Sequence, residues 1–476
     1  MNNKQFIFSH SSPKNHDNCS VVKIKHYTLQ FNTNLKYTHA QEGDFSLHLL
    51  GSLFDYVDTK SSNQDLLDIL VKQQTKEGFF KLLDTYYGEY VIIYVTKKEF
   101  FLLSDSCAQK EVYYTEDYAE LGSQLNLLSN KDCRQENHPY YNSTLFDKKK
   151  LFIGTSTSST NVKHLAPNHY IDLSNKETVR FFPVTKIESQ PIDDVAKKAA
   201  VMLKGYITAI SHRHKIILPV TGGFDSRLLF LASLHTECDY FVSQHKDMDD
   251  DHYDIKIAQE ITALFNKKLH VIKDSEASND TLDTTQNIDN PRTTSFPKLI
   301  ADKILINGNI SEIARNYFNY ITPVTAKKLT LLNGYSDNVF VIDTYQEWLS
   351  QNKKTLNQYD YNLLDMFYWE EKMGNWTAKA KTEAHALNFE LMSPFNSRAL
   401  LRLLLATKRK DRDKFTSRLY KKIIEYLVDN HEAVNAIPTN PDFERARALF
   451  LKKIGLFNMF DALRLELRIL KRKIKR

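Results

Sequence analysis

The segment Thr221–Arg227, with the sequence Thr-Gly-Gly-Phe-Asp-Ser-Arg, combines residue types that can hold phosphate groups and a metal ion. The apolar run Ile216–Val220 before it predicts a short buried strand, and Leu228–Ala232 after it predicts a helix. Glycines let the backbone approach an anion, and the N–H groups at a helix N-terminus stabilise negative charge. The spacing therefore predicts a site for nucleotide phosphates at this strand–helix junction.

The side chains of this segment have distinct expected roles. The hydroxyls of Thr221 and Ser226 can donate hydrogen bonds to phosphate oxygens, and the carboxylate of Asp225 can hold Mg²⁺ against the same phosphates. Gly222 and Gly223 supply backbone N–H groups. An ordinary glycine turn is the alternative for two adjacent glycines, but it leaves the flanking hydroxyls and the carboxylate unexplained.

This segment resembles the Ser-Gly-Gly-x-Asp-Ser signature of the PP-loop ATP pyrophosphatases, with Thr221 in place of the first Ser. It lacks the Gly-x-x-x-x-Gly-Lys spacing of a Walker P-loop. Three later stretches resemble, in the same order, those of asparagine-synthetase-like enzymes: Phe241–Asp254, Ile306–Glu312 and Phe389–Arg398. The resemblance covers roughly residues 190–425 and implies an α/β PP-loop domain with a parallel sheet, similar to the adenine nucleotide alpha hydrolases.

The resemblance implies where ATP and Mg²⁺ would bind. The ends of two strands, near Val220 and Ser243, would contact adenine through the backbone. The family's Gly-x-Gly-Ala-Asp-Glu loop supplies a second Mg²⁺ carboxylate, and it has lost its Asp here, so Glu312 would join Asp225 as a metal ligand. A surface position at the start of a helix is the alternative for Glu312.

The family also uses a lysine to stabilise charge on the activated acyl group and on pyrophosphate, in a Lys-x-x-x-Arg-like stretch. Lys414 has that spacing here, in the stretch Lys-Phe-Thr-Ser-Arg. The basic run Lys408–Arg412 lies just before it, and a solvated basic helix face is the alternative for the whole region.

Three arginines, Arg227, Arg315 and Arg398, have no counterpart in asparagine synthetase. Guanidinium groups favour carboxylate or phosphate partners. We therefore expect an acceptor that is larger and more anionic than free aspartate, such as a sugar acid or a nucleotide sugar. We also expect Arg315, Glu312 and Lys414 to be the catalytic residues. Internal ion pairs are the alternative for each arginine.

The first part of the chain is rich in short apolar and aromatic runs. Glu89–Val95 and Phe100–Ser104 predict two strands joined by a polar turn, and residues 63–83 predict a single helix. From about residue 190 strands alternate with helices, which predicts a parallel sheet with crossovers, and the last third is mainly helical.

The N-terminal region resembles a class II glutamine amidotransferase, an αββα sandwich. The matching pieces are Tyr87–Tyr90, Leu103–Ser106 and Leu165–Tyr170, the last similar to a Pro-Gly-His element of the family. That family uses a cysteine at position 2 as its nucleophile, and this chain has Asn2 there. The resemblance therefore implies a scaffold without glutaminase activity.

The predicted organisation has three parts. Residues 1–185 form an α+β amidotransferase-like (Ntn) domain, residues 190–430 an α/β ATP pyrophosphatase domain with a helical C-terminal part, and residues 431–476 a basic helical extension. The extension alternates apolar and basic residues at near-helical spacing. It is expected either to lie on an anionic membrane surface or to cover a domain and end in a solvated basic tip.

Composition excludes several classes of protein. A net charge of +6 over 476 residues is too modest to indicate nucleic-acid binding. Four dispersed cysteines exclude a disulfide framework and a Cys-x-x-Cys zinc site, which favours a reducing cytoplasm. No apolar stretch has the length of a signal peptide core or of a membrane span.

These features predict an ATP- and Mg²⁺-dependent ligase that adenylates a carboxylate, with ammonia or an amine as the second substrate. Amidation of sugar acids in surface polysaccharides is the expected setting. Two alternatives stay open: an intramolecular amide-forming cyclase, similar to β-lactam synthetases or lasso-peptide cyclases, and a non-catalytic scaffold. The acceptor, the nitrogen donor and the oligomeric state have no signal in the sequence.

Overall fold

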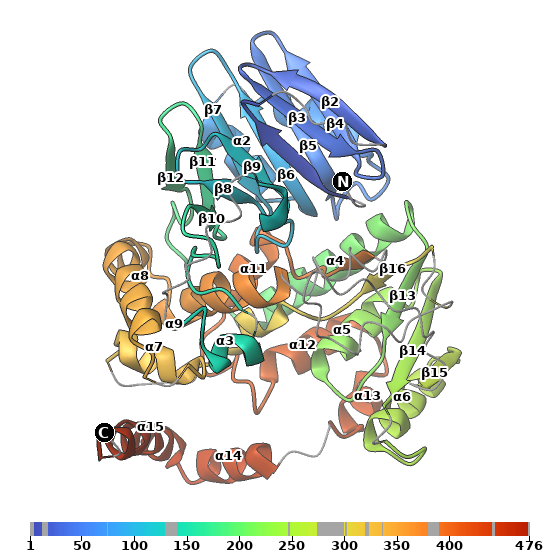
Figure 1. The fold of residues 1–476 in the computed structure, drawn as a ribbon. Helices are drawn as coiled ribbons and strands as arrows, with labels where there is room; N and C mark the ends of the chain where they lie inside the picture. The colour runs from blue at the N-terminus through green and yellow to red at the C-terminus, as the bar shows by residue number, and fades with distance from the viewer. Residues whose placement is uncertain are drawn as a thin grey trace.

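The chain folds into an antiparallel sandwich at one end of the molecule and a parallel sheet with surrounding helices at the other, in a computed structural model (Figure 1). The structure describes residues 4–474 with the exception of 12–17, 74, 129–139, 150, 246–247, 274–298, 300–301, 319–322, 336, 379–389 and 440–442. Among these residues, no helix combines the length and the apolar character that crossing a membrane requires.

Two six-stranded antiparallel sheets form the sandwich. One has the strand order β10 (Val162–His164), β8 (Tyr113–Thr115), β9 (Glu120–Gly122), β1 (Phe6–Ser9), β3 (Tyr27–Asn32) and β2 (Cys19–Ile24). The other has the order β12 (Glu177–Arg180), β11 (His169–Asp172), β7 (Phe100–Ser104), β6 (Tyr87–Val95), β5 (Phe45–Phe54) and β4 (Tyr37–Glu42). The predicted pair of strands corresponds to β6 and β7.

The sandwich has a dry core between its sheets and a second core on the outer face of the second sheet. Along β6, Val91 and Ile93 point into the core between the sheets, whereas Ile92 and Tyr94 point to the outer face. This alternation follows from the two-residue period of a strand, and it explains why every residue of β6 is buried. Helices α1 (Asn63–Val71) and α2 (Lys76–Leu83) cover the outer face.

The single helix predicted over residues 63–83 is therefore two helices, because a new cap interrupts it. Thr75 accepts a hydrogen bond from the Gly78 N–H and starts α2, as threonine often does at a helix N-cap. In the described residues no α-helix contributes to the cores of the first sheet. Three of the four layers of the predicted αββα sandwich are thus described.

A five-stranded parallel sheet dominates the second half. Its strand order is β15 (Leu269–Lys273), β14 (Cys238–Gln244), β13 (Ile216–Pro219), β16 (Ile304–Ile306) and β17 (Glu390–Met392). From β13 the chain builds the sheet outward in one direction through β14 and β15, and then in the other through β16 and β17. Strand order therefore reverses between β13 and β16, and crevices at such switch points are where open α/β sheets bind ligands.

Helices pack against this sheet and extend away from it. On the sheet's main core face lie α4 (Ile192–Ser211), α5 (Phe224–Ser233) and α12 (Arg418–Leu427). Further α-helices in the described residues are α3 (Thr144–Lys149), α6 (Tyr253–Leu264), α7 (Ala326–Leu332), α8 (Val339–Gln358), α9 (Leu363–Phe367), α11 (Arg398–Leu405), α13 (His431–Ala436), α14 (Phe443–Lys453) and α15 (Phe457–Ile474). The predicted alternation of strands with helices and the helical last third are confirmed.

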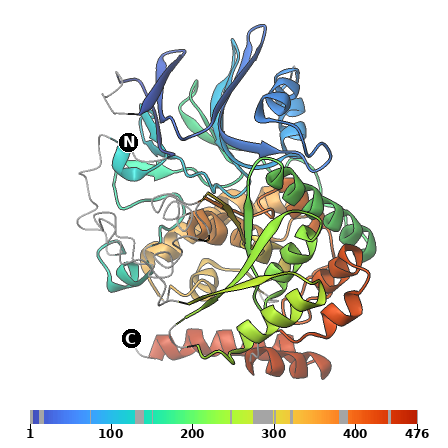
Figure 2. The same ribbon diagram turned by 90° about the vertical axis from the view of Figure 1, so that its right-hand side faces the viewer.

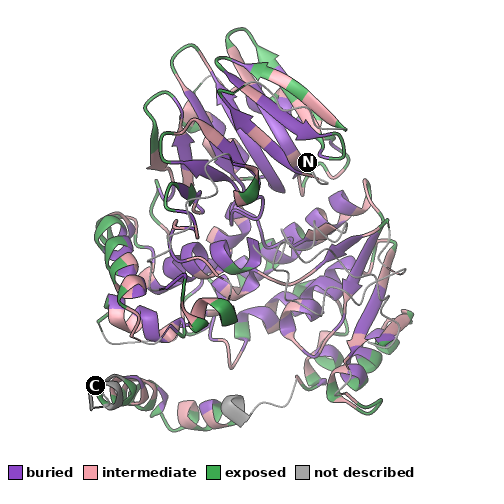
Figure 3. Ribbon diagram, in the orientation of Figure 1, coloured by how far each residue is buried: buried purple, intermediate pink, exposed green. Residues whose placement is uncertain are grey.

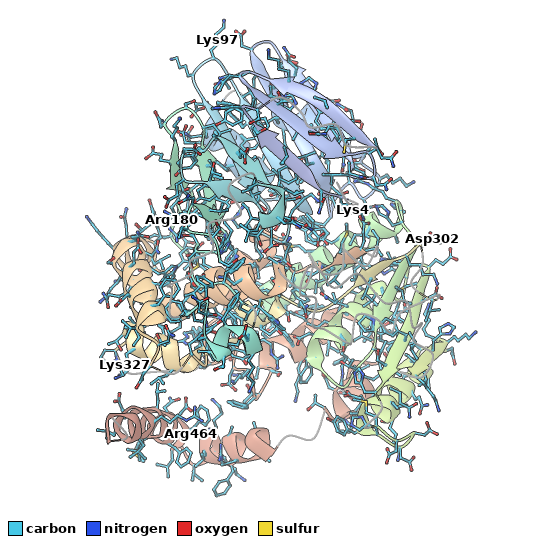
Figure 4. The ribbon with its side chains drawn as sticks, in the orientation of Figure 1. Lys4, Lys97, Arg180, Asp302, Lys327 and Arg464 are labelled. Carbon is cyan, nitrogen blue, oxygen red and sulfur yellow. The ribbon has the colours of Figure 1, made fainter. Side chains whose placement is uncertain are left out.

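Buried polar contacts join the sandwich to the helical part. Asn396 donates to Asp105 and to the Gly88 carbonyl, and its side-chain oxygen accepts from the Cys107 N–H. Arg180, at the lower end of the sandwich in Figure 4, forms a bidentate pair with Glu370 at 2.7 Å. Buried hydrogen bonds of this kind are costly to break, so the two parts are held in one arrangement.

Candidate functional site

The predicted phosphate segment forms a tight turn between β13 and α5. Gly223 is the N-cap of α5, and having no side chain it leaves the end of the helix without a side-chain cap. The hydroxyls of Thr221 and Ser226 share a hydrogen bond of 2.8 Å, and the Thr221 N–H also donates to Ser226 Oγ at 3.2 Å. Two hydroxyls and a bare helix N-terminus thus gather at the end of a parallel strand, as the sequence predicts.

The backbone N–H groups of this turn already have partners within the protein: that of Thr221 donates to Ser226 Oγ, and that of Gly223 donates to Thr221 Oγ1 at 3.4 Å. The Gly222 N–H donates to Asp254 Oδ1 at 3.0 Å. Asp254 lies in the first turn of α6, two residues after the N-cap His252. The sequence contains Asp254 in a stretch that resembles the family, but no local pattern indicates that its carboxylate would reach Gly222. A phosphate bound here would have to share or replace this hydrogen bond.

Asp225 is held by the short helix η4 (Ser311–Arg315), which follows the neighbouring strand β16. Ser311 Oγ donates to Asp225 Oδ1 at 2.7 Å, and Arg315 Nη1 pairs with Asp225 Oδ2 at 2.9 Å. Gly308 permits this approach, since a Cβ there would lie 2.6 Å from Asp225 Cβ and 3.0 Å from its carbonyl carbon. The switch point thus brings together Asp225 and Arg315. Their spacing in the sequence does not reveal that they form an ion pair.

Glu312 lies in the same cluster, in surroundings that disfavour the charged form of its carboxylate. Burial and the nearby negative charge of Asp225 raise its pKa from 4.5 to about 7. Its buried Oε2 atom has no hydrogen-bond partner. Glu312 lies in the first turn of η4 and is half-buried, so it is a residue at a helix start that also stands near Asp225.

A divalent cation would suit these two carboxylates. A cation would satisfy the orphaned oxygen and favour the charged form of Glu312. In the described part of the chain no group of three or more His, Cys, Asp or Glu side chains could enclose a metal. Mg²⁺ does not require such a cage, because it is commonly held by one or two carboxylates together with substrate phosphates and water.

Lys414 is connected to this cluster through Arg315 and an aromatic side chain. Arg315 Nη2 donates to the Lys414 carbonyl at 3.3 Å. The Lys414 ammonium lies 4.5 Å from the centroid of the Tyr317 ring, close enough for a cation–π contact. Tyr317 in turn lies close enough to Glu312 and Arg315 to interact electrostatically with both. The structure therefore places Lys414 beside the predicted site.

Lys414 also lines a cavity of about 330 Å³, named here the arm pocket because α15 forms one of its walls. Cationic and aromatic groups predominate around it, with one carboxylate. Its lining consists of Tyr317, Phe318, Leu332, Lys414, Phe415, Phe457, Asp461, Arg464, Leu465 and Arg468. A cavity of this size with a few charged groups resembles a small-ligand site that favours anions.

The two residues expected to contact adenine lie near the ends of adjacent strands. The Val220 N–H donates to the Phe241 carbonyl at 2.8 Å, which leaves that amide engaged within the protein. Ser243 pairs in register with Ile272 of β15 and is half-buried. Both positions are at the carboxyl end of the sheet, the edge that carries the turn at Gly223.

Arg227 and Arg398 both bind within the protein, Arg398 through the kind of internal ion pair raised as the alternative from sequence and Arg227 through backbone carbonyls. Arg227 is fully buried and donates to the carbonyls of Val434, Ile437 and Pro438 at 3.0 Å each. Arg398 is equally buried and pairs with Asp84 at 2.8 Å. Neither guanidinium is available to a substrate, so both help to hold the fold.

The basic run before Lys414 forms turns, not a helix face, and only Lys408 and Lys410 in it are exposed. Arg412 is buried and pairs with Asp365 at 2.6 Å, and Arg409 donates to the side chain of Asn316. These residues position the loop that carries Lys414, because Asn316 directly follows η4.

The loop Leu165–Tyr170, expected from sequence to match a Pro-Gly-His element, contains a residue with positive φ. Asn168 adopts φ +67°, a left-handed conformation that Asn tolerates better than most residues. Its side chain donates to Glu370 and accepts from Arg398. Asn2, on which the expected loss of glutaminase activity rests, lies outside the described residues.

No protein-family model matches the chain, and no curated protein matches it significantly. The parallel sheet and the geometry at its switch point are therefore the observations from which function is argued.

Proposed function

We propose that the protein is an ATP- and Mg²⁺-dependent ligase that adenylates a carboxylate and transfers the acyl group to ammonia or an amine. One observation carries the proposal: at the switch point of the parallel sheet, the Thr221–Ser226 turn meets a pair of carboxylates, Asp225 and Glu312, one of which has an unsatisfied buried oxygen. Phosphate-binding groups and a cation-binding pair at one sheet edge are what cleavage of ATP between its α- and β-phosphates by a substrate carboxylate requires.

Different residues of the site would bind the phosphates, the metal ion and the substrate. The hydroxyls of Thr221 and Ser226 and the N-terminus of α5 bind the pyrophosphate part of ATP. Asp225 and Glu312 would hold Mg²⁺, which supplies neutralisation of the phosphate charge when bound. Arg315 pairs with Asp225, so its guanidinium lies beside the metal ligand, where it could bind a phosphate or carboxylate oxygen of the substrates.

The reaction has two balanced steps. A substrate carboxylate oxygen attacks the α-phosphorus, a phosphorus–oxygen bond to that carboxylate forms, and the bond to the bridging oxygen breaks to release pyrophosphate. The amine then attacks the acyl carbon, a carbon–nitrogen bond forms, AMP leaves, and the amine loses a proton. Lys414 would stabilise the negative charge that develops in both steps. An intramolecular amine would make the same chemistry a cyclisation.

The arm pocket supports an anionic acceptor with a ring. Its cations Lys414, Arg464 and Arg468 outnumber its one carboxylate, Asp461, and aromatic side chains form much of the wall. Cations bind acid groups, and aromatic faces pack against sugar or other rings. Sugar acids, as expected from the sequence, fit this chemistry.

The test is calorimetric titration of Mg-ATP into the wild type and two variants. Asp225→Ala should abolish binding because it removes a metal ligand. Gly223→Ala should fold normally, since the new Cβ would lie 3.6 Å from its nearest neighbour, Thr221 Oγ1, yet it should weaken binding by blocking the approach of phosphate. Asp194→Ala, the same change in the exposed first turn of α4, is the control and should bind like the wild type.

A second candidate, a non-catalytic scaffold, is favoured by a different observation. Asp225 and the Gly222 N–H, which would meet Mg²⁺ and phosphate, both already have protein partners, Arg315 and Asp254. A wild type that binds no Mg-ATP, either alone or with a panel of sugar acids, would contradict the ligase and support the scaffold. Mg-ATP binding, together with release of AMP and pyrophosphate only when a sugar acid is added, would exclude the scaffold.

A further inference from the structure

Exposed apolar side chains gather on the two C-terminal helices. Twenty large hydrophobic residues of the described chain are exposed, and nine of them lie between positions 449 and 470. Phe450 is 62% exposed, Met459 61% and Leu463 54%. The nine residues are Leu449, Phe450, Ile454, Leu456, Met459, Phe460, Leu463, Leu467 and Leu470. Isolated exposed hydrophobics are ordinary, but a contiguous group marks an interaction surface.

The helices that carry this group form an arm at one end of the molecule. Figures 1 and 2 both place α14 and α15 at the end opposite the sandwich, and Figure 3 shows the arm to be largely exposed or half-buried. Gly455 separates the two helices with φ +75°, a conformation that ends α14 and starts a new direction. The exposed residues continue across this turn through Ile454 and Leu456.

The apolar side of helix α15 faces away from the protein and its charged side faces the protein, the reverse of an ordinary surface helix. Met459, Leu463, Leu467 and Leu470 are three or four residues apart, so they share one side of the helix, and all are exposed. The other side faces the protein and contributes Asp461, Arg464 and Arg468, with Phe457 and Leu465, to the arm pocket. Arg464 is labelled beside the arm in Figure 4. A helix that only covered a domain would turn its apolar side inward.

The C-terminal segment that contains the arm, residues 443–476, is strongly basic. Residues 443–476 contain eleven Lys and Arg against three Asp and Glu, a net charge of +8, whereas the whole chain carries +6. The remaining 442 residues are therefore slightly acidic in total. Positive charge is concentrated on the same 34 residues that expose the apolar side.

We propose that the arm, α14 and α15 together, binds the surface of an anionic lipid bilayer, with Met459, Leu463 and Leu467 inserted among the acyl chains. An exposed apolar side on basic helices matches the chemistry of helices that lie in the membrane interface. Acidic headgroups attract the +8 charge, at about 1 kcal/mol for each Lys or Arg near the surface. A second copy of the chain is a poor occupant, because pairing two arms would bring two +8 segments together.

The test uses the full-length protein and sedimentation with vesicles, so it does not depend on the proposed ligase activity. The wild type should sediment with vesicles of phosphatidylcholine and phosphatidylglycerol, and much less with vesicles of phosphatidylcholine alone. Leu463→Ser with Leu467→Ser should reduce the partition coefficient by about a hundredfold, roughly tenfold for each leucine withdrawn from lipid. Both side chains are exposed, so the double variant should keep the thermal unfolding transition of the wild type.

A matched control separates this surface from general hydrophobicity. Val184 and Val339 are each 64% exposed and lie outside the arm, so Val184→Ser with Val339→Ser should leave vesicle binding unchanged. The proposal is overturned by a wild type that does not sediment with anionic vesicles, or by equal loss of binding in the two double variants. It is also overturned if the arm leucines are needed for self-association or for binding an acidic protein while vesicle binding is absent.

Discussion

Replacement of Glu312 by Gln should stabilise the protein, and by an amount that depends on pH. Burial and the charge of Asp225 raise the pKa of Glu312 from 4.5 to about 7 in the folded state. Ionising this group therefore costs more in the folded chain than in the unfolded chain. Since one pKa unit corresponds to about 1.4 kcal/mol, the change from 4.5 to about 7 corresponds to about 3 kcal/mol.

The sign and the pH window follow from these two pKa values. Below pH 4.5 Glu312 is protonated in both states and costs nothing; as pH rises from 4.5 to 7 the unfolded chain loses its proton first, and the folded protein becomes relatively less stable. Glu312→Gln cannot ionise and avoids this loss. Its advantage over the wild type should grow from near zero at pH 4.5 to about 3 kcal/mol at pH 8.

Urea unfolding of both proteins across this pH range measures the difference, with Glu260→Gln on the exposed face of α6 as the control. Added Mg²⁺ at pH 8 should stabilise the wild type and should have little effect on Glu312→Gln, because the cation relieves the repulsion between the two carboxylates. A constant difference between the proteins at every pH would refute the reasoning, since it would show that Glu312 does not titrate in this window.

Three further substitutions test other parts of the structure. Gly308→Ala should abolish Mg-ATP binding in calorimetry, because its Cβ would lie 2.6 Å from Asp225 Cβ and must displace that side chain. Arg227→Met should lower the free energy of unfolding by about 3 kcal/mol in urea titrations, as three buried carbonyls lose their donor; an unchanged midpoint would contradict this assignment. Asp84→Ala should cost about 3 kcal/mol by leaving the buried Arg398 charge unpaired, measurable as a lower thermal midpoint, whereas a variant as stable as the wild type would show that the pair is not required.

Local sequence was sufficient to predict the turn at Thr221–Ser226 and the strand and helix that flank it. A buried apolar run, two glycines and an apolar helix are adjacent in the chain, so their order alone determines the local geometry. The same holds for the alternation of strands and helices after residue 190. The three-part division of the chain, with boundaries at 185, 190 and 430, stays a prediction.

The partners of the site residues could not be predicted in the same way. Asp225 meets Arg315 across 90 positions, and Gly222 meets Asp254 across 32, because adjacent parallel strands deliver these residues to one sheet edge. The strand order that brings β16 beside β13 is a property of the whole sheet, and no local spacing encodes it. The burial of Arg227 is another example, since its carbonyl partners lie in α13 or just after it, more than two hundred residues away.

The two sides of α15 also link two binding events to each other. The inner side completes the arm pocket beside Lys414, and the outer side is the surface proposed for lipid. A ligand in the pocket that steadies the helix must favour attachment on the outer side, and attachment must favour the ligand by the same factor, because the coupling free energy between two sites is reciprocal. The amount of acceptor held by the protein would then report whether the chain is free in solution or at a surface.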